Sequence, residues 1–255
     1  MVGVEQVERG LDALRAALAL ALSPGSALAG PQILLMADVD TPPTGSPGSG
    51  GRGPGSYGDA DQATSSETDE ADRERLIALV ELARGGDKEA FGLLYDHYHV
   101  SVYRFLYYRT RSQTLAEDLT SETFFRALRS MNSFRWQGRD FGAWLMTIAR
   151  NLTTDHFKAG RTRLELTTED MTAHDDVTDG PEDAVLASLT NEALLEALSE
   201  LPTEQRECLI MRFLQGMSIA ETALALERSD GAVKQLQLRG VRNLAKLLPE
   251  GLRDA

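Results

Sequence analysis

The sequence predicts an all-α protein of two small helical modules, joined by a flexible linker and preceded by a largely disordered N-terminal extension. Apolar residues recur at the three-four spacing of helices, and no convincing strand alternation appears. Pro, Gly and Ser dominate residues 41–58, and seven acidic side chains fill residues 164–182. A length of 255 residues suits two small domains plus linkers. The expected division is an extension over 1–72, a first module over 73–163, an acidic linker over 164–180 and a second module over 181–255.

The N-terminal extension begins with a predicted amphipathic helix over residues 4–22, because Val4, Val7, Leu11, Leu14 and Leu18 fall on one face. Alone, such a helix is marginal and needs a surface to lie against. A secretory signal is disfavoured, since acidic residues precede the apolar part and charges interrupt it. We hypothesise that the helix either folds back on a module or is removed by cleavage in the tether over 41–72.

The first module reads as a bundle of four helices. Gly85 and Gly86 end the first helix and Asp87 caps the second, while the third and fourth cover about 115–128 and 140–158. The apolar residues that form the first helix are Leu76, Ile77, Val80 and Leu82. The residues expected to face inward from the other three helices are Ala90, Phe91, Leu94, Tyr95, Tyr98, Val102 and Leu106, then Leu119, Phe124 or Phe125, and Leu128, and finally Phe141, Trp144, Leu145, Ile148 and Leu152.

A loop rich in aromatics and arginines, NSFRWQGRDF, separates the third and fourth helices. Phe134 and Trp136 alternate with Arg135 and Arg139, and aromatics beside cations are suited to unstacked bases of single-stranded nucleic acid. The two rings could equally plug the end of the bundle, and the sequence leaves both readings open.

The second module contains a predicted helix-turn-helix within QGMSIAETALALERSDGAVKQLQLRGVR. Ser218 can cap a first helix, the chain breaks at Arg228, and Ser229 or Asp230 can cap a second helix. In a major groove, Arg or Lys can read guanine and Gln can read adenine. Two amphipathic helices with a basic outer face also occur in ordinary bundles. The candidate DNA-contacting residues are Ser229, Lys234, Gln235, Gln237, Leu238, Arg239 and Arg242.

Composition limits the possible functions. The net charge of −13 argues against a DNA binder that acts alone, so a larger partner is expected to hold this chain on DNA. Cys208, the single cysteine, is expected to be a core thiol in a reducing cytoplasm. The four histidines are scattered, and no phosphate loop or nucleophile elbow occurs, so we expect no enzyme activity, no metal and no cofactor.

Several motifs in order resemble the extracytoplasmic-function (ECF) group of bacterial sigma factors. They are GDKEAFGLLYDHY, AEDLTSETFFRAL, FGAWLMTIARNLTTDHFK and LPTEQRECLIMRFLQGMSIAETA, which together cover about residues 73–248. The resemblance implies a polymerase subunit that directs promoter recognition, strand opening and transcription initiation, in a developmental or stress programme. It also implies an anti-sigma factor, often membrane-anchored, and a linker that passes through the polymerase cleft.

The resemblance further implies a role for each surface. The first module is similar to sigma domain two, and its third helix would bind the clamp helices of core RNA polymerase through Glu117, Asp118, Ser121, Glu122 and Phe125. The loop and the fourth helix would hold flipped bases of the minus-ten element through Phe134, Arg135, Trp136, Gln137, Arg139, Arg150, Asn151, Thr154 and Lys158. The second module is similar to sigma domain four, which binds the polymerase flap and lays its second helix on duplex DNA of the minus-thirty-five element.

Two departures from the family pattern bear on these roles. Gly240 stands in the recognition helix where many members have alanine, which either loosens the helix end or allows close packing. The basic residues Lys158, Arg161 and Arg163 come later than the usual arginine pair. An autonomous helix-turn-helix regulator, which would bind DNA without polymerase, is the alternative function.

Overall fold

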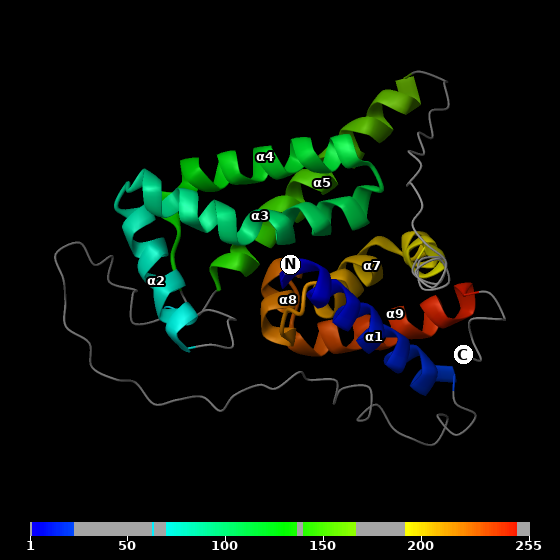
Figure 1. Cartoon of the computed structure of the whole chain (residues 1–255). Coiled ribbons are helices and arrows are strands. Elements are labelled where there is room, and N and C mark those ends of the chain that lie inside the picture. Colours follow the sequence, from blue (N-terminus) through cyan, green and yellow to red (C-terminus); the bar gives the residue numbers. More distant parts are fainter. Residues whose placement is uncertain (1, 23–62, 64–69, 137–139, 167–191, 249–255) are drawn as a thin grey trace, which may run out of the picture.

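The computed structural model describes residues 2–22, 63, 70–136, 140–166 and 192–248, and these form helices and connecting turns without a β-strand (Figure 1). The elements, in chain order, are α1 (Val2–Leu22), α2 (Glu70–Arg84), α3 (Lys88–Thr110), α4 (Gln113–Ser130), η2 (Met131–Ser133), α5 (Phe141–Leu166), a helical segment over 192–200, α7 (Thr203–Leu209), η3 (Ile210–Leu214), α8 (Ile219–Leu226) and α9 (Asp230–Leu247). The expected tether and most of the acidic linker lie outside the described residues.

The first module packs α3, α4 and α5 side by side, with α2 across one end (Figure 1). Local chemistry fixes the helix ends. The Asp87 side chain accepts hydrogen bonds from the amides of Glu89 and Ala90 and caps α3, and the Ser112 hydroxyl caps α4. Gly86 provides the positive φ that separates α2 from α3. The chain therefore turns sharply after α2, which lies across the end of the bundle that α3 begins (Figure 1).

Several expected core residues are placed differently by the fold. Phe124 is buried and Phe125 is exposed, which resolves the open choice on α4. Tyr95 and Leu128 were expected inside the bundle, and that prediction was wrong, because each is an exposed side chain. Leu82, an apolar residue of the first helix, is exposed as well. A three-four stripe is wider than the face that a short helix buries against its neighbours, so residues at the edge of the stripe remain at the surface.

The C-terminal module combines α7, η3, α8 and α9. A full capping box begins α8, since the Ser218 hydroxyl accepts from the Glu221 amide while the Glu221 carboxylate accepts from the Ser218 amide. Glu227 ends α8 in the left-handed conformation, and Ser229 caps α9. The turn at residues 227–229 therefore produces the expected helix-turn-helix.

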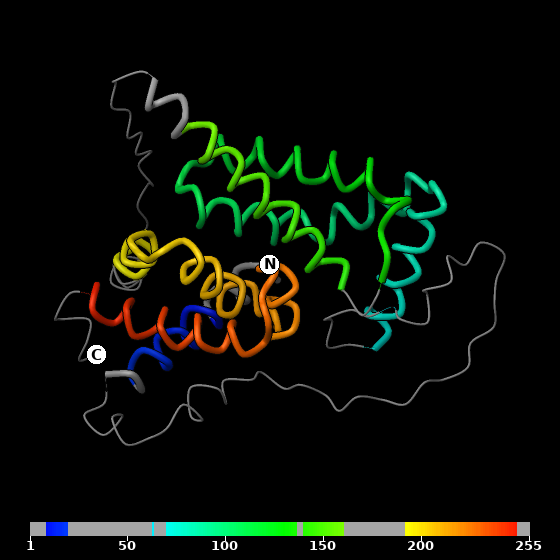
Figure 2. Tube along the Cα trace, turned by 180° about the vertical axis from the view of Figure 1, so that it is seen from behind, coloured from blue at the N-terminus to red at the C-terminus, as the bar shows by residue number. Residues whose placement is uncertain are grey.

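Helix α1 lies against this C-terminal module, in contact with α9 and η3 (Figures 1 and 2). Its buried side chains are Leu11, Leu14, Ala17 and Leu18. The helix approaches so closely at Gly10 that an added Cβ would stand 2.1 Å from the Phe213 carbonyl oxygen. Of the two fates considered for the N-terminal helix, this arrangement corresponds to folding back on a module.

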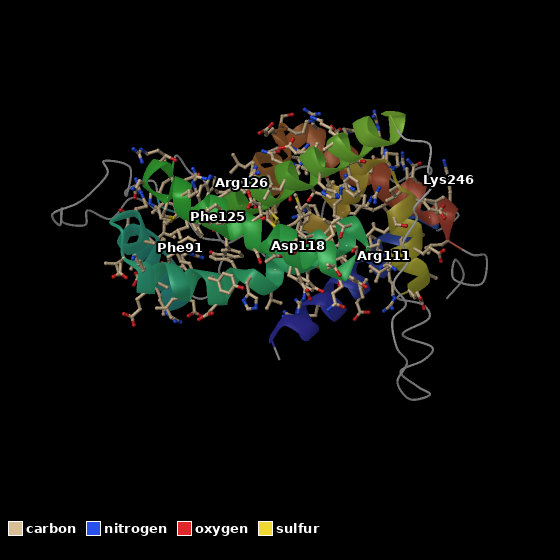
Figure 3. The ribbon with its side chains drawn as sticks, turned by 90° about the horizontal axis from the view of Figure 1, so that it is seen from above. Phe91, Arg111, Asp118, Phe125, Arg126 and Lys246 are labelled. Carbon is tan, nitrogen blue, oxygen red and sulfur yellow. The ribbon has the colours of Figure 1, made fainter. Side chains whose placement is uncertain are left out.

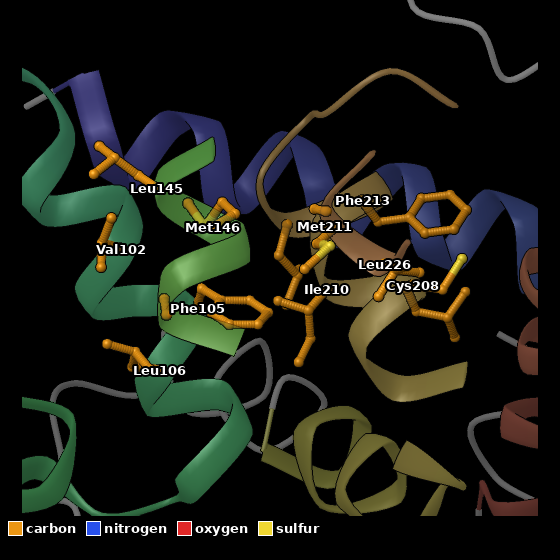
Figure 4. Close-up of a cluster of buried hydrophobic side chains, with 14 of the residues drawn as sticks. Val102, Phe105, Leu106, Leu145, Met146, Cys208, Ile210, Met211, Phe213 and Leu226 are labelled. Atoms are coloured by element: carbon orange, nitrogen blue, oxygen red, sulfur yellow. The ribbon is translucent and has the colours of Figure 1, made fainter. Parts of the chain in front are cut away.

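The two modules also pack against each other, because α8 lies on α5 and η3 lies near α3. Buried apolar side chains form one continuous cluster across the junction. Figure 4 shows Phe105 and Met146 of the first module beside Ile210 and Met211 of the C-terminal module. The interface between the modules is therefore largely apolar.

Candidate nucleic-acid and polymerase interfaces

The outer face of α9 presents the basic side chains expected to read DNA. Lys234, Gln235, Arg239 and Arg242 are all exposed, and Ser229 is exposed at the helix start. The Ser229 hydroxyl accepts from the Ala232 amide, so it both caps the helix and faces solvent. Positive side chains and a glutamine on one accessible helix face fit the donors and acceptors of a major groove.

Gln237 and Leu238 are placed less favourably for DNA contact. Gln237 is 3% exposed, and its Oε1 accepts from Arg212 Nε at 3.1 Å. Arg212 also donates to the Met217 carbonyl in the turn before α8. Gln237 thus joins α9 to the rest of its module, and Leu238 is half-buried. In this arrangement neither side chain belongs to the open face of α9.

Gly240 packs closely rather than loosening the helix. A Cβ at this position would stand 3.1–3.3 Å from three carbon atoms of the Leu209 side chain. Glycine therefore lets α9 cross α7 at short range, which is the second of the two possibilities raised by its sequence position.

The aromatic side chains of the loop after α4 lie inside the first module. Trp136 is 1% exposed, and its Nε1 donates to Glu81 Oε1 at 2.6 Å. The same carboxylate oxygen accepts from Arg84, whose guanidinium lies over the Phe134 ring. Phe134 in turn meets Phe141 and Trp144. Neither ring of the pair Phe134 and Trp136 is accessible to a base in this arrangement.

Glu81 and Arg84, which hold this loop from α2, were not anticipated from the sequence. The only local signal was the i, i+3 spacing of an acid and a base near a helix end. Arg135 is exposed beside the buried rings, while Gln137 and Arg139 lie outside the described residues. The loop therefore presents one described cation next to a packed aromatic core.

Helix α5 carries the remaining residues expected at the minus-ten element. Asn151 and Lys158 are exposed, and the half-buried Thr154 donates its hydroxyl to the Arg150 carbonyl. Arg150 instead reaches the C-terminal module, where its Nε donates to Glu207 Oε2 at 3.0 Å. The helix continues to Leu166, although the side chains of Arg161 and Arg163 lie outside the described part.

The outward face of α4 mixes acids with an exposed aromatic ring. Glu117, Asp118 and Ser121 are exposed, and the Glu122 carboxylate accepts from Arg126 at 2.7 Å. Phe125 is 54% exposed, with the Arg129 guanidinium 5.6 Å from its ring centre. Figure 3 shows Asp118, Phe125 and Arg126 along one side of this helix. All five residues expected to meet the polymerase share this accessible surface.

The described part of the chain also places the single cysteine and the side chains that could bind a metal. Cys208 is buried, and desolvation raises the pKa of its thiol to about 12, so it is the expected core thiol. No cluster of three or more His, Cys, Asp or Glu side chains there could hold a metal ion. None of the helices searched combines the length and apolarity of a membrane span.

These features define a two-module helical protein with the architecture of the sigma-70 class. Residues 94–163 match the family model of Sigma-70 region 2, and residues 191–244 match that of Sigma-70 region 4. The chain is 55% identical over 184 residues to the ECF RNA polymerase sigma factor BldN of Streptomyces coelicolor, covering 72% of this chain and 70% of the relative. It is 37% identical over 175 residues to SigX of Bacillus subtilis, covering 66% and 89%.

The chain belongs to the ECF family of RNA polymerase sigma factors. A solved structure of the sigma factor RpoE with the anti-sigma factor NepR, from Bartonella quintana, shares the fold at a TM-score of 0.52 and 22% identity, covering 62% of this chain and 95% of that chain. The expected family, the all-α fold and the role as a transcription initiation factor are confirmed.

Proposed function

We propose that this sigma factor directs core RNA polymerase to promoters through three separate surfaces. The outer face of α9 binds the minus-thirty-five duplex, α5 with the loop before it binds the opened minus-ten strand, and α4 binds the clamp helices of the polymerase. The exposed basic face of α9 is the observation that carries this proposal. The proposed boundaries remain 1–72, 73–163, 164–180 and 181–255, with the flap of the polymerase bound by the last module.

At the minus-thirty-five element, the contacts are assigned to the exposed residues of α9. Lys234, Arg239 and Arg242 supply cations for phosphates or guanine, and Gln235 supplies a bidentate amide for adenine. Ser229 lies at the N-terminus of α9, where a backbone phosphate is favoured by free amides and the helix dipole. Gln237 and Leu238 support this face from inside the module.

At the minus-ten element, Arg135, Asn151 and Lys158 form the described surface that can meet the opened strand. Gln137 and Arg139 extend the set on sequence grounds, and Thr154 supports α5 beside it. The buried Phe134 and Trp136 hold the loop in shape, so stacking of a base on them requires the loop to rearrange. Arg150 joins the surface only when Glu207 releases it.

On the polymerase side, Phe125 is the proposed centre of the contact on α4. Exposed aromatic side chains are enriched among the residues that contribute most to binding, and Phe125 lies on the same helix face as the acids Asp118 and Glu122, with Arg129 against its ring. The net charge of −13 agrees with a factor that needs the polymerase to stay on DNA. The chain itself supplies specificity and no catalytic activity, cofactor or metal.

Family membership also suggests where and with whom this sigma factor works. We place it in the cytoplasm, on the nucleoid when bound to polymerase, in a developmental or stress programme. An anti-sigma factor that binds both modules is the expected inhibitor, and anti-sigma factors of this family are often anchored in the membrane. Helix α1, docked on the C-terminal module, is a second candidate for control.

Transcription in vitro tests this proposal most directly. Purified chain and core polymerase are expected to start transcription on members of a promoter library, whereas the chain alone gives no footprint. Phe125→Ala should lower the apparent affinity for core polymerase about thirtyfold, which corresponds to roughly 2 kcal/mol. The matched control Leu82→Ala removes an equally exposed apolar side chain from α2 and should change it little. A footprint without polymerase, or association without new initiation, would contradict the proposal.

A further inference from the structure

A buried carboxylate joins the two modules of this sigma factor. Glu207 lies on α7 in the C-terminal module, and its side chain is 1% exposed. Its Oε1 accepts from Arg109 Nε on α3 at 3.0 Å, and its Oε2 accepts from Arg150 Nε on α5 at 3.0 Å. Both arginines belong to the first module. We call this three-residue contact the Glu207 bridge.

The charges around Glu207 make its carboxylate indispensable to this contact. Arg109 is itself buried, and its guanidinium lies over the Phe157 ring of α5. Burial, and then the charge of Arg109, lower the pKa of the neighbouring Arg206. Removing the charge of Glu207 would leave the guanidinium groups of Arg109, Arg150 and Arg206 close together. Uncompensated charge at a buried site is strongly unfavourable. The contact between the two modules therefore depends on the side chain of Glu207, which accepts from an arginine on each of α3 and α5.

The position of the bridge relates it to promoter binding. Arg150 is one of the residues assigned to the minus-ten surface, and α5, which carries that surface, also packs against α8 of the helix-turn-helix. Buried apolar side chains of both modules, including Phe105, Met146 and Ile210, belong to one cluster that crosses the same junction (Figure 4). While the modules are packed, Arg150 is held by Glu207 and is withdrawn from the minus-ten surface, although Asn151 and Lys158 on the same helix stay exposed.

We propose that this intermodule surface is a releasable docking surface, and that the Glu207 bridge holds the free sigma factor in a closed, inactive arrangement. The partner of the surface on α3 and α5 is the C-terminal module of the same chain, recognised by apolar packing and by one carboxylate between two arginines. Opening frees Arg150 and the adjoining face of α5. This inference rests on the proposed use of α5 at the minus-ten element.

The closed arrangement can be measured directly without polymerase. Fluorophores attached through Thr114→Cys on α4 and Lys246→Cys on α9 report on the separation of the modules, because both positions are exposed and the native thiol of Cys208 is buried. Glu207→Gln keeps the shape of the side chain and removes its charge. The fraction of molecules in which the two modules are separated, here called the open population, should rise about tenfold or more in this variant.

A matched control lies one turn earlier on the same helix. Glu204 is exposed and pairs with Arg228 inside the C-terminal module, so Glu204→Gln removes the same charge without touching the first module. In the Glu204→Gln variant, the efficiency of energy transfer between the two fluorophores should equal that of the unmodified chain. Arg109→Gln weakens the bridge from the opposite side and should also raise the open population, while circular dichroism verifies that each variant keeps its helices.

Transcription provides the functional readout. With limiting core polymerase, Glu207→Gln should reach half-maximal initiation at about one tenth of the concentration that the unmodified chain needs. Unchanged transfer efficiency in both Glu207→Gln and Arg109→Gln, or opening with no gain in transcription, would overturn the inference. Absence of initiation by the unmodified chain on every promoter would instead contradict the proposed function, so the two failures are distinguishable.

Discussion

Helices α9 and α5 carry the residues proposed for the two promoter elements. The two helices differ in how many of these residues are exposed to solvent. On α9, the basic side chains of Lys234, Arg239 and Arg242 point outward. On α5 and its loop, two aromatic rings are buried and Arg150 is bonded to the other module. The proposed minus-thirty-five surface is accessible as it stands, whereas part of the proposed minus-ten surface is buried or bonded to the other module. Such a difference fits a factor whose strand-opening module is released only on the polymerase.

The largest expected effect tests whether Trp136 belongs to the core. Trp136→Ala removes a buried ring and its hydrogen bond to Glu81, and should lower the free energy of unfolding by about 3–5 kcal/mol. Urea unfolding measures this loss. Arg135→Ala, at the exposed neighbouring position, should change stability by less than about 0.5 kcal/mol. Equal stability of the two variants would mean that the ring is free for bases after all.

The next test compares two glutamines of α9 that sequence alone treats alike. Gln237→Ala removes the acceptor of Arg212 Nε and should lower the free energy of unfolding by about 1–3 kcal/mol. Gln235→Ala should leave stability unchanged and weaken binding to the minus-thirty-five duplex by about 1–3 kcal/mol in a holoenzyme binding assay. If Gln235→Ala lowered stability and Gln237→Ala weakened DNA binding, the assignment of Gln237 to the inner face of α9 and of Gln235 to its outer face would be reversed.

The packing of α1 on the C-terminal module can be disrupted by adding a single carbon atom at Gly10. Gly10→Ala places a Cβ against the Phe213 carbonyl and should reduce stability by about 1–3 kcal/mol and make α1 sensitive to protease. Gly92→Ala is the matched control, since a Cβ there meets nothing within 4 Å, and it should stabilise α3 by up to about 1 kcal/mol. Promoter binding through α9 should persist in both variants. Resistance of α1 to protease in Gly10→Ala would refute the docking.

The smallest expected effect concerns the helix that lies between the two promoter surfaces. Ser218→Ala removes the capping box of α8 and should cost about 1 kcal/mol in thermal unfolding. Glu221→Gln retains a side-chain acceptor for the Ser218 amide, so its loss should be smaller. A larger loss for Glu221→Gln than for Ser218→Ala would show that the Glu221 carboxylate, and not the Ser218 hydroxyl, contributes most to the cap.

The sequence by itself determined the helices, their caps and the family. The side chains of Asp87, Ser218 and Ser229 accept from amides only two or three residues away. The apolar spacing is a property of each helix by itself, so the caps and the helices can both be predicted from local sequence. Tertiary structure alone decided which ambiguous residues face inward, as with Trp136 and Gln237. It also decided that Glu207 meets Arg109, 98 residues away, and Arg150, 57 residues away. Such pairings depend on how whole helices cross, and the energy of burying a charge or a ring is set by neighbours that no local pattern specifies.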